Sequence, residues 1–140
     1  MGARTKARKR ALDILFEADS KNVPVASILA EHVRRRDVAG EPALNDYTVT
    51  LVEGVAAHQG QIDTALHGAA KGWTVERMPA VDRAILRLGT YELLFSGEVP
   101  AGVAISEAVD LATSLSTDES PAFVNGVLAG IVDGDSKQGE

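Results

Sequence analysis

The stretch that decides the fold is Val81-Asp82-Arg83-Ala84-Ile85-Leu86-Arg87-Leu88-Gly89-Thr90-Tyr91-Glu92-Leu93-Leu94. Wound as a helix of about 3.6 residues per turn, it is apolar on most of its circumference, so we expect it at the centre of a helical bundle. Its charges then need partners, because unpaired charge in a core is costly. We expect Arg83, Arg87 and Glu92 to pair with other helices or reach the rim, and Asp82 to favour the helix dipole.

Helical periodicity continues on both sides of this stretch, and no segment alternates cleanly over the length of a strand. The expected helices lie at about 5–19, 24–36, 46–66 with a break near Gly60, 81–95, 103–115 and 120–133. Ser120 is expected to cap the last of them, with Pro121 at its first position. The sequence therefore predicts an all-α domain of roughly seven helices over residues 1–133, followed by a polar, disordered tail at 134–140.

Composition excludes most catalytic and metal-dependent functions. The chain has 140 residues, no cysteine and three histidines without metal-ligand spacing. Glycine-rich phosphate loops and a Gly-x-Ser-x-Gly elbow are missing as well. Asp63 and His67, four residues apart, are expected to form a surface pair, not a catalytic dyad. We therefore expect no enzymatic activity, no metal and no cofactor.

No apolar run approaches the length of a membrane span, and no signal-like apolar stretch follows the basic start. We therefore expect a cytoplasmic protein that does not contact a membrane.

Positive charge is confined to the beginning of the chain. Residues 1–36 hold nine lysines and arginines against four acidic residues, whereas the remainder holds five against sixteen, for a net charge of −6. Lys6, Lys9 and Arg10 lie on the polar side of the first expected helix. A local basic element on an acidic body favours contact with a polyanion at one edge of the molecule.

The other motifs and the aromatic residues of the chain indicate which type of nucleic acid these cations would bind. No helix-turn-helix with a polar, base-reading second helix is visible, which disfavours double-stranded DNA. Single-stranded RNA is bound by basic grooves with a few stacking aromatic residues. Phe16 and Phe123 are the candidate aromatic residues, although either is also typical of a core.

Several stretches together resemble one family over nearly the whole chain. They are the basic start running into Ala7-Arg8 and Ala11-Leu12, Asp82 to Leu88 with Tyr91-Glu92-Leu93, Pro100 with Val103 to Val109, and Phe123-Val124-Asn125-Gly126-Val127-Leu128, with Gly54-Val55, Ile62-Asp63 and Trp73 between them. This pattern resembles the NusB family of transcription antitermination factors. The resemblance implies two packed helical bundles and no catalysis.

The resemblance also implies partners and site residues. Family members bind the boxA element of ribosomal RNA leader transcripts together with NusE, a small-subunit ribosomal protein. That complex joins other Nus factors on RNA polymerase, so that terminators are read through. The residues that match RNA-binding positions, or continue the basic run, are Arg4, Lys6, Arg8, Lys9, Arg10, Phe16 and Phe123. Asp82 and Glu119 match positions near partner surfaces. Phe16 stands where the family often has tyrosine, so it can stack but cannot donate a hydrogen bond.

Two alternatives stay open at this point. A related helical domain serves as the RNA-binding part of some ribosomal-RNA cytosine methyltransferases, but these residues contain no Rossmann-like segment. The other alternative is a helical interaction module whose basic helix docks an acidic protein. Whether the chain forms a homodimer is also open.

Overall fold

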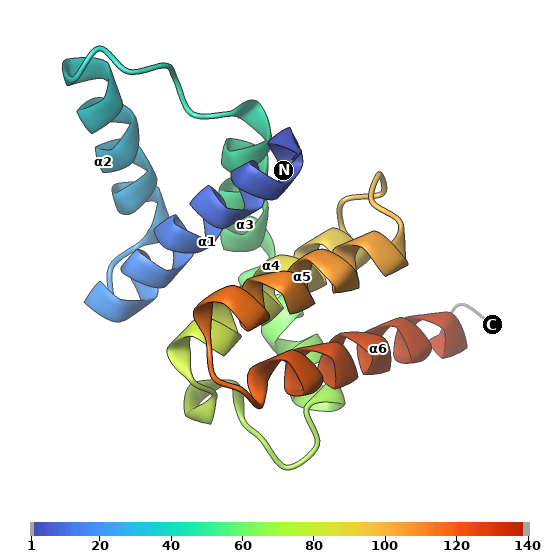
Figure 1. The fold of residues 1–140 in the computed structure, drawn as a ribbon. Helices are drawn as coiled ribbons and strands as arrows, with labels where there is room; N and C mark the ends of the chain where they lie inside the picture. Colours follow the sequence, from blue (N-terminus) through green and yellow to red (C-terminus); the bar gives the residue numbers. More distant parts are fainter. Residues whose placement is uncertain (1, 139–140) are drawn as a thin grey trace. The chain divides into compact units, whose positions relative to one another are not determined.

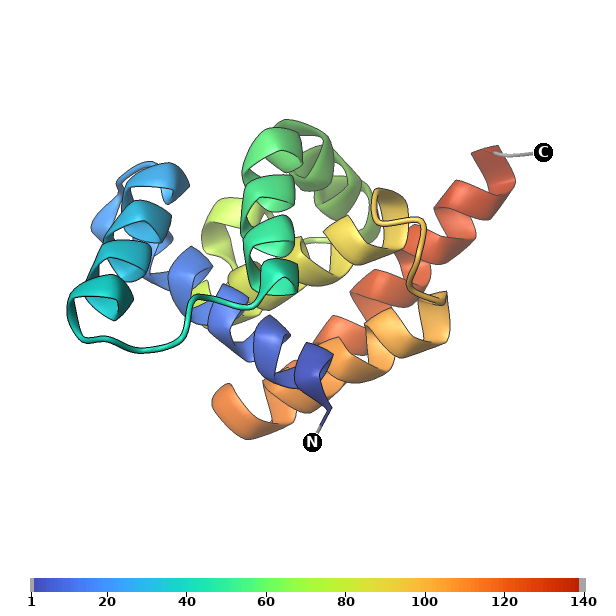
Figure 2. The same cartoon turned by 90° about the horizontal axis from the view of Figure 1, so that it is seen from above.

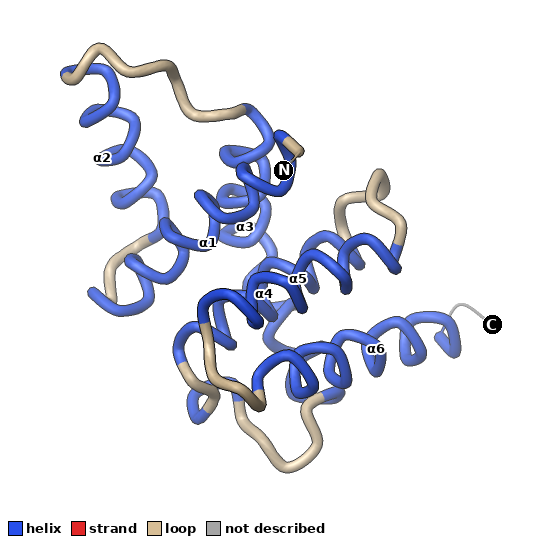
Figure 3. Tube along the Cα trace, in the orientation of Figure 1, coloured by secondary structure: helices blue, strands red, loops and turns tan. Residues whose placement is uncertain are grey.

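The structure is built from helices. The computed structural model describes residues 2–138, and within that range only helices and their connections occur (Figures 1 and 3). The elements are α1 (Ala3–Lys21), α2 (Val25–Val38), α3 (Asp46–Ala69), the 3-10 helix η1 (Val75–Arg77), α4 (Ala80–Leu94), α5 (Ala101–Leu115) and α6 (Ser120–Gln138). The all-α prediction is confirmed. Among the described residues, no helix is long and apolar enough to cross a membrane.

The chain divides into two compact units within α3. The first unit ends at Ala57 and the second begins at His58. His58 has φ −116° and ψ 15°, which lie outside the helical range, so α3 is kinked there, two residues before Gly60 and close to the predicted break. The His58 ring stacks on Phe95 of the second unit, with ring centroids 4.1 Å apart. Two units agree with the two helical bundles that the resemblance implies.

The first unit consists of α1, α2 and the beginning of α3. Its buried apolar residues are Ala7, Ala11, Leu12, Ile14, Leu15, Ala18, Ile28, Leu44, Leu51, Val52 and Val55. Asn22 ends α1 in the left-handed conformation (φ 54°), which asparagine tolerates better than most residues. Helical periodicity predicts burial of Val25, Leu29 and Val33 beside Ile28, yet Ile28 is the one buried residue of α2. The other three line an open groove of about 1110 Å³ that α2 shares with residues of α3.

In the second unit α4 lies beside α5 and α6, as both ribbon views show (Figures 1 and 2). Nine of its residues are buried, which confirms the central position predicted from its apolar circumference. Gly89 permits the close approach to α6, because a Cβ there would lie 2.9 Å from Cδ1 of the fully buried Leu128, which would have to move.

The last helix is longer than expected. α6 continues to Gln138 and passes through Gly134, where the sequence predicted the start of a disordered tail. A single glycine costs a helix only about 1 kcal/mol relative to alanine, so it does not by itself end one. The expected tail is therefore helical as far as Gln138, and residues 139–140 lie outside the described residues.

The charges of α4 find partners, as predicted for Arg83 and Arg87. Arg87 donates from Nε and NH2 to both carboxylate oxygens of Asp63 in α3, at 2.9 and 3.0 Å. Arg83 donates to the carbonyl oxygens of Val75 and Met78 at 3.1 and 3.2 Å, so it satisfies backbone groups around η1. The predicted pairing of Asp63 with His67 does not form, because Asp63 faces α4 and its carboxylate is occupied by Arg87.

Candidate nucleic-acid interface

Four of the five predicted cations of α1 are exposed. Arg4, Lys6, Lys9 and Arg10 carry exposed side chains. Lys6, Lys9 and Arg10 are three and four residues apart, and residues at that spacing are neighbours on one helix face. Arg8 differs, because only 3% of its surface is exposed. Direct contact between Arg8 and a polyanion is therefore not available in this structure, and its role has to be an internal one.

The two arginines off that face share an aromatic partner, Tyr47 at the start of α3. The Arg4 guanidinium carbon lies 4.3 Å from the centre of the Tyr47 ring, and that of Arg8 lies 5.6 Å from it. Both distances are within the range of a cation–π interaction. Beside them the Thr48 hydroxyl donates to the carbonyl oxygen of Ala7 at 3.0 Å. The basic end of α1 is thus held by the first turn of α3.

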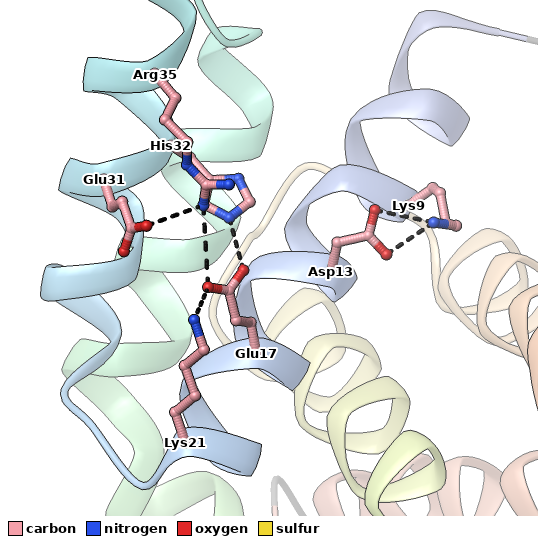
Figure 4. A network of polar contacts seen from close by, with 7 residues as sticks. All are labelled: Lys9, Asp13, Glu17, Lys21, Glu31, His32 and Arg35. Atoms are coloured by element: carbon pink, nitrogen blue, oxygen red, sulfur yellow. Dashed lines mark hydrogen bonds and ion pairs between the residues drawn. The ribbon is translucent and has the colours of Figure 1, made fainter.

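Carboxylates on the exposed side of α1 are paired within the protein. Lys9 contacts both oxygens of Asp13, at 2.7 and 2.9 Å. Glu17 accepts from His32 Nε2 and from Lys21 Nζ, each at 2.9 Å, and Arg35 lies 4.0 Å away (Figure 4). The hydrogen bond from His32, followed by that from Lys21, lowers the pKa of Glu17 from 4.5 to about 2. These pairs reduce the repulsion that a phosphate would meet along α1.

Lys6 and Arg10 remain as the available cations of this face. Within the part of the chain whose side chains the structure describes, neither makes an ion pair. One helical turn separates them, a rise of about 6 Å along the axis. An exposed cation without an internal partner can release bound counterions to a phosphate without first breaking a contact. The arrangement therefore suits a phosphate backbone that runs along α1.

The two predicted stacking residues belong to different units. Phe16 of α1 is 37% exposed, so one part of its ring is available to a ligand. Phe123 of α6 is partly exposed and lies against Trp73, with ring centroids 5.8 Å apart. Trp73, which is 48% exposed, is a surface aromatic residue that the sequence marked only by its position in the family pattern.

The two predicted partner-binding residues have opposite environments. Glu119 is exposed, but Asp82 is only 2% exposed. The Asp82 carboxylate accepts from the hydroxyls of Ser116 and Ser120 at 2.5 and 2.9 Å. It therefore ties the start of α4 to the connection between α5 and α6, and it presents no surface to a partner. The Ser120 oxygen also accepts from the Thr117 N–H at 3.3 Å. α6 begins at Ser120, and the helix cap predicted for its side chain stays a prediction.

Sequence reasoning missed Tyr47 as a functional candidate. It is a partly exposed aromatic residue in the first turn of α3, where periodicity alone assigns it to the apolar stripe. About forty residues separate it from Arg4 and Arg8, and no spacing rule connects positions so far apart. The described residues also contain no group of three side chains that could hold a metal ion.

The helical fold and cation-bearing first helix place the chain among all-α proteins built from two helical units. The NusB family pattern matches residues 5–133. The chain is 56% identical to the transcription antitermination protein NusB of Beutenbergia cavernae over 136 residues (91% of this chain, 88% of that protein). It is 58% identical to that of Saccharopolyspora erythraea over 132 residues (94% and 87%).

A solved structure extends the comparison. A chain in the crystal structure of antitermination factors NusB and NusE in complex with dsRNA has a TM-score of 0.79 and 28% identity, covering 94% of this chain and 96% of that one. Together these matches establish the family: the chain belongs to the NusB family.

Proposed function

We propose that this protein is a transcription antitermination factor that acts in the cytoplasm. In this proposal it binds boxA RNA of ribosomal RNA leader transcripts together with NusE and helps RNA polymerase read through terminators. The relatives are named for antitermination, and a structure of the same fold contains NusE and RNA. The single observation that carries the RNA-binding part is the pair Lys6 and Arg10, exposed and without internal ion pairs on a helix whose acids are already paired.

The proposed contacts divide by chemistry. Lys6, Arg10 and Arg4 are exposed and bind phosphates, and Lys9 does so once it gives up its pair with Asp13. Phe16 and Phe123 stack on unpaired bases, a contact that tolerates any base. Arg8 supports this face from inside the fold.

NusE is assigned to a separate surface that includes Glu119. Asp82 contributes to it by holding the loop that precedes Glu119. Other Nus factors and RNA polymerase join the complex once RNA and NusE are bound.

The test removes the two available cations. Lys6→Ala/Arg10→Ala is titrated with fluorescently labelled single-stranded boxA RNA, with and without NusE, at two salt concentrations. For a single strand, each lost phosphate contact lowers the slope of log affinity against log salt concentration by about 0.7. The slope measured for the double variant should therefore be smaller by about 1.4. Arg34→Ala/Lys71→Ala removes the same charge from exposed positions outside α1 and should bind nearly as the unaltered protein does.

Three outcomes separate the proposal from its rivals. Equal affinity and slope for the Lys6/Arg10 variant and the unaltered protein would refute the RNA assignment to α1. Equal retention of RNA with and without the boxA sequence would favour a general interaction module. Stronger binding of a double-stranded version of the same RNA would replace the single-strand assignment. NusE binding should be unchanged in the Lys6/Arg10 variant.

A further inference from the structure

The first turn of α3 contributes a residue to RNA binding that lies outside the basic helix. We propose that Tyr47 is a positioning residue: its ring holds the Arg4 guanidinium in the place where it meets RNA, and it holds Arg8 next to it. This inference rests on the proposed function, since it assigns Tyr47 a part in the same RNA-binding surface.

The contacts define the position of Arg4. Its guanidinium carbon lies 4.3 Å from the Tyr47 ring centre, which is close stacking for a cation–π pair. The Arg8 guanidinium lies farther away, at 5.6 Å, and is buried. The ring therefore contacts one arginine that reaches solvent and one that does not.

The backbone around this stack is fixed as well. Thr48 is buried, and its hydroxyl donates to the carbonyl oxygen of Ala7, one residue before Arg8. This bond sets the register between the first turn of α3 and the second turn of α1. Tyr47 is the neighbour of Thr48 in sequence, so its ring is carried to the same level of α1. The stack is therefore a consequence of how the two helices are joined.

Stacking leaves Arg4 able to bind a phosphate. A guanidinium stacks through its flat face, while its five N–H donors point outward in the plane of the group. Arg4 is an exposed residue, so a phosphate can approach it from solvent. A free arginine loses conformational freedom when it contacts a phosphate, whereas one already held by an aromatic ring loses less. Tyr47 thus pre-organises Arg4 for a bidentate phosphate contact.

The experiment compares Tyr47→Leu with Tyr47→Phe, using fluorescently labelled single-stranded boxA RNA and the full chain. Leucine keeps an apolar side chain but removes the ring, so RNA affinity should fall about fivefold, the cost of immobilising one long side chain that is no longer held in advance. Phenylalanine keeps the ring face and should bind within about twofold of the unaltered protein. Because phenylalanine also keeps the packing of tyrosine, this comparison is combined with a second one that involves Arg4.

A double-mutant cycle with Arg4→Ala tests whether Tyr47 acts through Arg4. If it does, Tyr47→Leu changes RNA affinity less than about twofold when Arg4 is already alanine. An equal loss in both backgrounds would overturn the inference, and so would unaltered RNA affinity of the Tyr47→Leu variant.

Two further measurements distinguish a failure of this inference from misfolding of the Tyr47→Leu variant and from a failure of the proposed function. In the unaltered protein, the Arg4 δ-protons should show an upfield NMR shift from the Tyr47 ring; its absence overturns the inference even if Tyr47→Leu does not fold. If Lys6→Ala/Arg10→Ala weakens RNA binding and Tyr47→Leu does not, the inference alone fails. If neither variant weakens it, the proposed function fails.

Discussion

Replacing Asp82 by alanine should destabilise the second unit strongly, although the residue lies in the first turn of α4. Its carboxylate is 2% exposed and accepts from Ser116 at 2.5 Å and from Ser120 at 2.9 Å. Alanine removes both acceptors and leaves two hydroxyls without them. It also removes an acid from the first turn of α4, where the helix dipole favours negative charge.

The magnitude follows from these two bonds. Hydrogen bonds to a charged group contribute about 1.5–3 kcal/mol each, so their sum sets an upper limit of about 6 kcal/mol. The Ser116 and Ser120 oxygens lie 2.9 Å apart, and the Thr117 hydroxyl lies 2.8 Å from Ser120, so the hydroxyls can pair with one another once the carboxylate is gone. We therefore expect Asp82→Ala to lower the free energy of unfolding by about 2–4 kcal/mol.

Asp82→Asn separates geometry from charge. The amide keeps one acceptor oxygen, and its nitrogen can donate to a hydroxyl that turns to accept. Asp82→Asn should therefore lower the free energy of unfolding by less than Asp82→Ala does, by about 1–2 kcal/mol. The control is Asp110→Ala, an exposed acid of α5, which should stay within about 0.5 kcal/mol of the unaltered protein.

Urea denaturation followed by far-UV circular dichroism measures these free energies. Emission from Trp73, the one tryptophan of the chain, adds a local probe because its ring contacts Phe123 in the first turn of α6. If Asp82→Ala is as stable as Asp110→Ala, the reasoning about the buried carboxylate is refuted.

Two other predictions concern ion pairs. The pKa of Glu17 is lowered from 4.5 to about 2, so the stabilising effect of its carboxylate is complete above pH 4.5 and disappears as the pH falls towards 2. Glu17→Gln should therefore flatten the loss of stability over that pH range in acid denaturation curves. Arg87 and Asp63 form a bidentate and partly buried pair, so a double-mutant cycle on them should give a coupling free energy above about 1 kcal/mol. The same cycle on the exposed pair Lys9 and Asp13 should give about 0.3–0.5 kcal/mol. Equal coupling free energies for the two pairs would contradict the role assigned to burial.

Helical periodicity predicted the helices well because it depends on local spacing. α4 and α5 begin within about two residues of the predicted positions and end at or beside them, and prolines precede α2, α4 and α5 as expected of helix starts. The same periodicity overestimated burial in α2. A stripe of apolar residues shows which face turns inward, but it does not show whether another helix covers that face. Val33 is exposed for that reason.

The candidate site was predicted in its residue types but not in its arrangement. Lys6, Lys9 and Arg10 share a face because of their spacing, which the sequence displays directly. The burial of Arg8 does not follow from that spacing. Arg8 is buried in the first unit, where one of its neighbours is Tyr47 of another helix. The same is true of Asp82, whose hydroxyl partners lie 34 and 38 residues away.

The sequence alone determined the all-helical class, the basic character of the first helix and the family likeness, because each depends on residue type and local spacing. Only the tertiary structure decided which cations reach solvent, that His32 of α2 pairs with Glu17 of α1, and where the buried carboxylate of Asp82 acts. Those properties depend on which helices meet and in what register, and contacts between residues far apart in the chain set both.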